Sequence, residues 1–163
     1  MNSLDIDAIN SISPYDVIEE NGRLYFKTDN NITYLVSFDE EDNPFYLVYW
    51  FNLTNATHIA SPSDKKIAQT VICVIEEFFR KNPNILLYMC SNDGGQQAQR
   101  SRLFLRWFNK AEQQKHYIIR STEVKGENGL DYVALIIQRS NPHANEIISL
   151  FDSDIGMFNE MKP

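Results

Sequence analysis

The change in hydrophobic spacing near residue 61 is the feature that most constrains the fold of this chain. Before it, apolar residues occur in short runs separated by turn residues. After it, residues 61–83 repeat apolar side chains at the three- and four-residue spacing of an amphipathic helix. A run of strand patterns followed by helical patterns within 163 residues is typical of an α+β fold.

The strand-like part begins with a hairpin signal. Asn21-Gly22 stands between two extended runs, and both central residues of a type I′ turn need a positive φ. Polar turns follow at TDNN and DEEDNP, and FYLVYWFNL is apolar enough for the middle of a sheet. We therefore expect an antiparallel meander over residues 15–53.

A helix is predicted next. Ser61 is the expected N-cap, Pro62 occupies the first helical position, and Asp64 lies in the first turn. Ile67, Val71, Val74, Ile75 and Phe78 form its apolar side, and Asn82-Pro83 ends it.

The remaining segments alternate between strand and helix. ILLYMC predicts a buried strand, residues 96–114 a second helix, and HYIIRSTEV with LDYVALIIQRS a hairpin around the Gly126 to Gly129 turn. Residues 143–161 predict an amphipathic segment broken near residue 153 into two short helices. We expect it to cover its own sheet, and the alternative is that it docks on a second chain.

These patterns together predict one domain over residues 1–163. Its fold class is α+β, with a largely antiparallel sheet of about six to seven strands, helices over one face and a C-terminal helical segment. Residues 1–14 are polar with isolated apolar residues and are compatible with a loose N-terminal arm.

The charge balance and the termini limit the classes of partner. With 22 acids against 15 bases, the net charge of −7 disfavours binding to nucleic-acid phosphates. No apolar run has the roughly 18 residues that span a bilayer, and the N-terminus lacks the basic and apolar parts of a secretory signal. We expect a soluble cytoplasmic protein in which Cys73 and Cys90 are free thiols.

One strand–loop–helix stretch, CSNDGGQQAQRSRLFLRWFN, is the candidate ligand site. Arg100 falls on the apolar stripe of the second helix, where an unpaired guanidinium would be very costly. It either pairs with Asp93, Glu76 or Glu77, or it contacts a bound phosphate or carboxylate. In the second case the anion would be held by the helix N-terminus, by Arg100 and by the loop residues Ser91, Asn92, Asp93, Gly94 and Gly95.

Other candidate sites have simpler explanations. The acidic residues 39–42 lack the frame of a calcium loop, and His58, His116 and His143 stand apart as surface residues. The aromatic residues of the fourth strand are expected in the sheet core. No catalytic motif and no nucleotide fingerprint is present, so the sequence indicates no metal and no cofactor, and it favours a non-enzymatic protein over an enzyme without deciding between them.

Several segments resemble a family of small bacterial proteins known only by a domain-of-unknown-function label. They are YFKT with YLVSF, TVICVIEEFF, ILLYMCSND and RSRLFLRWF, within residues 23–139. The resemblance implies that CSND and RSRLF form one unit, and it implies no activity. The acetyltransferase pyrophosphate loop is a poorer match, because Gln96 to Ser101 has no glycine where that loop needs one.

Two hypotheses for the function remain. The first is a non-enzymatic binding domain with a protein partner or a second copy of itself. The alternative is a small-molecule or anion-binding domain, transferase-like, that uses residues 91–100.

Overall fold

The computed structural model describes residues 1–43, 46–60, 62–90, 106, 108, 114–126 and 129–161. For residues 89–90, 123–126, 129–130 and 154–161 it describes the backbone alone.

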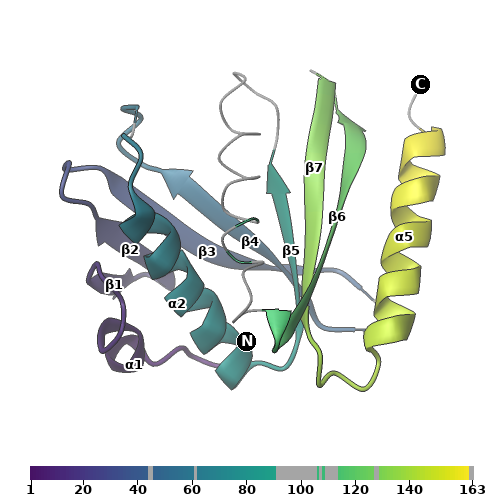
Figure 1. The fold of residues 1–163 in the computed structure, drawn as a ribbon, viewed down its shortest axis with the longest axis horizontal. Coiled ribbons are helices and arrows are strands. Elements are labelled where there is room, and N and C mark those ends of the chain that lie inside the picture. The colour runs from purple at the N-terminus through teal and green to yellow at the C-terminus, as the bar shows by residue number, and fades with distance from the viewer. Residues whose placement is uncertain are drawn as a thin grey trace. The chain divides into compact units, whose positions relative to one another are not determined.

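The described helices and strands form an α+β protein (Figure 1). They are α1 (Ile6–Asn10), β1 (Val17–Glu20), β2 (Arg23–Lys27), β3 (Thr33–Glu41), β4 (Val48–Asn55), α2 (Lys65–Lys81), β5 (Ile85–Cys90), β6 (Tyr117–Gly126), β7 (Gly129–Gln138) and α5 (Ala144–Met161). Seven strands form one open, mixed, mostly antiparallel sheet in the order β1-β2-β3-β4-β5-β7-β6. The predicted fold class is confirmed.

The first hairpin forms at the predicted turn. Asn21 and Gly22 have φ angles of 52° and 77°, so both central residues take the positive φ that a type I′ turn requires. β1 and β2 pair antiparallel with Val17 opposite Phe26, and β2 pairs antiparallel with β3. The predicted antiparallel pairing is therefore confirmed for β1, β2 and β3, and β4 is the next strand of the sheet. The turn before β4 is shifted along the chain, because β3 continues to Glu41 and β4 begins only at Val48.

The chain forms two compact units. Unit 1 comprises Met1–Glu40 and Phe51–Pro83, and unit 2 comprises Glu41–Trp50 and Asn84–Pro163. In unit 1, α2 buries one side against aromatic strand residues. The ring of Phe78 stacks on that of Phe38 at 4.7 Å, and Phe38 also contacts Phe51 at 5.7 Å. The predicted apolar side of α2 is therefore its core side.

Asp64, not Ser61, is the N-cap of α2. Its backbone is extended, and its carboxylate accepts a hydrogen bond from the N–H of Lys66 at 2.9 Å. The other carboxylate oxygen accepts a hydrogen bond from the hydroxyl of Tyr15. The helix therefore begins at Lys65, and Pro62 precedes it. The predicted cap was wrong because a carboxylate held by a distant tyrosine caps the helix three residues later.

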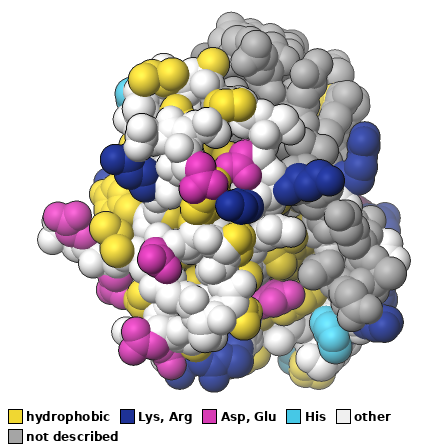
Figure 2. All heavy atoms as spheres, turned by 60° about the vertical axis from the view of Figure 1, so that its left-hand side comes forward, with side chains coloured by type: hydrophobic (Ala, Val, Ile, Leu, Met, Phe, Trp, Pro, Cys, Tyr) yellow, Lys and Arg dark blue, Asp and Glu magenta, His cyan; other side chains and the backbone are white. Residues whose placement is uncertain are grey.

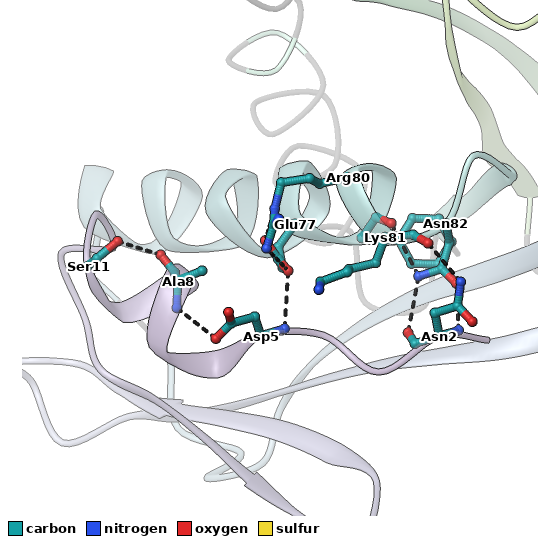
Figure 3. A network of polar contacts seen from close by, with 9 residues as sticks. Asn2, Asp5, Ala8, Ser11, Glu77, Arg80, Lys81 and Asn82 are labelled. Atoms are coloured by element: carbon teal, nitrogen blue, oxygen red, sulfur yellow. Dashed lines mark hydrogen bonds and ion pairs between the residues drawn. The ribbon is translucent and has the colours of Figure 1, made fainter.

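The N-terminal segment is anchored to α2, in contrast to the loose arm that the sequence suggested (Figure 3). Asp5 caps α1, and its own N–H donates to Glu77 at 3.1 Å. The N–H of Asn2 donates to Oδ1 of Asn82 at 2.6 Å, and Nδ2 of Asn82 donates back to the carbonyl of Asn2 at 3.2 Å. Polar groups that are buried in α2 thus bind the backbone of the arm, and no hydrophobic pattern reveals such contacts.

In unit 2, both faces of β7 are buried. Val133, Leu135 and Ile137 form a cluster with Ala144, Ile147 and Phe151 of α5. Ala134 and Ile136 point to the opposite face, where Ile136 pairs with Leu86 of β5 and Ile119 of β6. Phe108 contacts Tyr117 of β6 at 5.3 Å, two residues from Ile119, and so lies on that second face. Side chains therefore pack against both faces of β7 in this unit.

α5 is one continuous helix that packs on its own chain, alongside β6 and β7 (Figure 1). Its packing on the sheet of its own chain agrees with the prediction, but the predicted break near residue 153 was wrong. A glycine inside a helix costs only about 1 kcal/mol relative to alanine. The buried side chains of Ile147 and Phe151 offset a penalty of that size.

Candidate interaction surface

The ligand site predicted from the sequence lies outside the described residues. This holds for Ser91, Asn92, Asp93, Gly94, Gly95 and Arg100. Of the basic residues near Arg100, only Arg106 is described, and it is exposed as predicted. The anion-binding hypothesis therefore stays a prediction.

Glu77, one of the carboxylates considered as a partner for Arg100, pairs with Arg80. Its side chain is 6% exposed, and both of its oxygens accept hydrogen bonds from Arg80 at 2.8 Å. One of them also accepts the N–H of Asp5 (Figure 3). The buried polar groups Glu77 and Asn82 are thus satisfied by structural contacts, and neither has the character of a ligand site.

A second polar network in unit 1 surrounds Tyr15. Its hydroxyl donates to Asp64 and accepts the N–H of Asp29 at 3.3 Å, while Lys66 pairs with Asp29 at 3.1 Å and lies over the Tyr15 ring. Burial, followed by the hydrogen bond to Asp64, raises the pKa of Tyr15 to about 12. This network joins the chain before β1 to the start of α2.

This pKa predicts a loss of stability in strong alkali. The unfolded chain releases the Tyr15 proton near pH 10, whereas the folded chain retains it to about 12, so the folded state binds more protons in that window. The stabilisation is complete below about pH 10 and is lost as the pH rises toward about 12. Urea unfolding at several pH values should show a steeper alkaline decline for the wild type than for Tyr15→Phe. The same slope in both proteins would contradict this assignment, and Tyr25→Phe is the control.

In unit 2, three polar side chains meet where the N-terminus of α5 adjoins the chain before β4. The hydroxyl of Tyr46 donates to Oε2 of Glu146 at 3.0 Å, and Nδ1 of His143 lies 3.7 Å from the same oxygen. The rings of Tyr46 and His143 are 5.9 Å apart. The hydrogen bond to Glu146 raises the pKa of Tyr46, so its hydroxyl remains protonated at neutral pH.

Trp50 of β4 makes the matching contact with β3. Its Nε1–H donates to the carboxylate of Glu41, and its ring packs against the buried cluster under α5, as the ring of Tyr46 does. Leu150 lies four residues after Glu146, on the same flank of α5, and is 43% exposed. We call the set Glu41, Tyr46, Trp50, His143, Glu146 and Leu150 the aromatic surface.

Sequence reasoning missed this surface. It assigned Tyr46 and Trp50 to the sheet core together with Tyr49 and Phe51. Tyr49 and Phe51 are indeed 4% and 1% exposed, whereas Tyr46 and Trp50 are half-buried. The available signal was the period of two along the strand, which places residues 46, 48 and 50 on one face and residues 49 and 51 on the other.

The remaining groups considered in the sequence are the three histidines, Cys73 and possible metal ligands. All three histidines are exposed, as predicted. Cys73 is a half-buried free thiol, and burial raises its pKa, which keeps it protonated and unreactive. In the described part of the chain, no group of three or more His, Cys, Asp or Glu side chains could hold a metal ion.

Two further observations concern one side of the surface and the apolar character of the helices. On the side of the molecule in Figure 2, charged side chains of both signs separate several groups of hydrophobic side chains. Among the described residues, no helix combines the length and the apolar character that crossing a bilayer requires.

The chain is similar to one known protein family. The model of a family of unknown function, DUF6169, matches residues 63–153. The chain belongs to this family. The match confirms the predicted relationship to a family without a known function, and it runs from the segment before α2 into α5. Of the aromatic surface, His143, Glu146 and Leu150 lie inside the DUF6169 match, and the other three residues precede it. No curated protein and no solved structure matches the chain.

Proposed function

We propose that this protein is a binding module that recognises a partner protein through the aromatic surface of unit 2. The observation that carries the proposal is the partial exposure of two large aromatic side chains, Tyr46 and Trp50, in the unit in which α5 also exposes Leu150. Tyrosine and tryptophan are enriched in protein interfaces, where they supply a large contact area and lose little conformational entropy on binding.

The contacts that hold the rings of Tyr46 and Trp50 in place support the same function. Each ring packs against the buried cluster on one side, and its polar hydrogen is bonded to a glutamate. A side chain fixed in this way needs little further ordering when a partner binds, and a preorganised surface therefore retains more of its binding free energy.

Substitution of Leu150 tests the proposal. Leu150→Lys places a charge within the surface and should reduce the amount of cross-linked partner about tenfold, with little change in Tm, because the side chain is exposed. The matched control is Leu47→Lys. Leu47 is 55% exposed in the same unit but adjoins Val48, whose side chain faces α5, so by strand alternation it points to the other side.

Quantitative cross-linking to the partner proteins of the native cell extract is the measurement. A partner that is retained by Leu47→Lys and lost by Leu150→Lys supports the proposal. Equal retention by both variants contradicts it. Concentration-dependent self-association that is lost in Leu150→Lys would assign the surface to a second copy of the chain and would also contradict a different protein as partner.

A further inference from the structure

The charges of the aromatic surface are of one sign. Glu41 and Glu146 are exposed, the side chain of Glu146 by 70%, and the exposed Asp42 follows Glu41 directly. Within the described part of the chain, no Lys or Arg side chain forms an ion pair with any of these three carboxylates. The His143 imidazole lies 3.7 Å from Glu146 and is charged only when protonated. The described residues therefore leave the charge of these carboxylates unneutralised.

Each of the two half-buried aromatic rings, Tyr46 and Trp50, has a carboxylate at its polar edge. Glu146 accepts the hydroxyl proton of Tyr46, and Glu41 accepts the Nε1–H of Trp50. The π-face of an aromatic ring attracts a cation, most strongly for tryptophan, and a nearby carboxylate adds to that attraction. Two such ring and carboxylate pairs therefore favour the side chains of lysine and arginine.

Another carboxylate of α5, that of Asp152, is neutralised by an arginine of the same chain. Asp152, on the opposite flank of the helix, accepts hydrogen bonds from Nε and Nη2 of Arg120 at 3.2 and 2.8 Å. Glu146 has the Tyr46 hydroxyl as its donor instead of a guanidinium. Among the described residues, no arginine therefore takes the corresponding place beside Glu146.

From these observations we infer that the partner presents a basic segment, rich in Lys or Arg and with an apolar residue to cover Leu150, to the aromatic surface. The inference rests on the proposed function and specifies the partner's chemistry. The overall charge of −7 attracts such a segment over a longer range and repels nucleic acid and acidic proteins.

The test uses a fluorescein-labelled peptide of alternating lysine and leucine as the probe, with the full-length protein. Binding is measured by fluorescence anisotropy for the wild type and for the double variant Glu41→Gln, Glu146→Gln. Glutamine keeps the shape and the acceptor oxygen but removes the charge, so the fold and the hydrogen bonds of both rings are retained. The double variant should bind about five- to tenfold more weakly, and added salt should weaken wild-type binding further.

The charge-matched control is Glu19→Gln, Glu20→Gln. These exposed carboxylates belong to β1 in unit 1, and removing them changes the net charge by the same amount. Less than about a twofold loss is expected for this control. Equal losses for the two double variants would mean that the net charge alone attracts the probe, and the inference would then be wrong.

A second readout locates the bound peptide. The indole N–H of Trp50 gives one of two such signals in a proton–nitrogen correlation spectrum, since the chain has two tryptophans, and Trp50→Phe identifies it. The signal should shift on addition of the peptide, and an unchanged signal under saturation overturns the inference. If Leu150→Lys abolishes partner binding while the Glu41 and Glu146 variant does not weaken it, the proposed function stands and the basic partner is excluded.

Discussion

Replacing Phe151 with alanine should lower the free energy of unfolding by about 3–5 kcal/mol. Phe151 is 8% exposed and joins α5 to Val133, Leu135 and Ile137 of β7. Removing the ring leaves a cavity between the helix and the sheet, because close-packed neighbours relax only partly into such a space. Urea denaturation of the purified protein measures the loss.

The adjacent residue provides the control for Phe151→Ala. Leu150 is 43% exposed, and Leu150→Ala should cost less than about 1 kcal/mol. Hydrogen exchange should also show faster opening of the β6–β7 ladder in Phe151→Ala. If both variants were equally stable, α5 would not be part of the core of unit 2. Deleting residues 143–163 should have a larger effect of the same kind and leave unit 2 unfolded.

The second large effect is expected for Phe78→Ala in unit 1. Phe78 is fully buried, stacks on Phe38 at 4.7 Å and meets the edge of Phe79 at 5.3 Å. Loss of the ring should cost about 3–5 kcal/mol, from lost burial, from the remaining cavity and from two aromatic contacts. Amide exchange of α2 should accelerate accordingly.

Ile18→Ala is the control for Phe78→Ala. Ile18 lies on β1 and is 58% exposed, so its truncation removes little contact with the core and should cost less than about 1 kcal/mol. An equally small effect of Phe78→Ala would contradict the packing of α2 on β3. The two core substitutions also test the division into units, because each should accelerate exchange mainly in its own unit.

The aromatic surface depends on contacts that the local sequence pattern does not contain. Tyr46 bonds to a residue 100 positions later in the chain, and Trp50 packs against a cluster that includes Ile147 and Phe151 of α5. A strand pattern with five aromatic residues predicts a core position for each of them when each residue is taken alone. The partial exposure of Tyr46 and Trp50 appears only in the folded chain.

Local chemistry determined much of this fold. The Asn21-Gly22 hairpin followed from a backbone requirement that few residues meet, and the strand and helix types followed from hydrophobic periods of two and 3.6. These features depend on residues within a few positions of one another. Pattern reasoning therefore identified the meander, α2, β5, the β6–β7 hairpin and the apolar side of α5.

Tertiary structure decided the features that join distant segments. Tyr15 holds the cap of α2 from 49 positions away, Asn82 binds the backbone of Asn2 from 80 positions away, and Glu77 accepts the N–H of Asp5 from 72 positions away. α5 continues past residue 153 although its composition favours a break there. Each of the three hydrogen bonds is partly buried and contributes about 1 kcal/mol, and only the folded chain brings its two partners together.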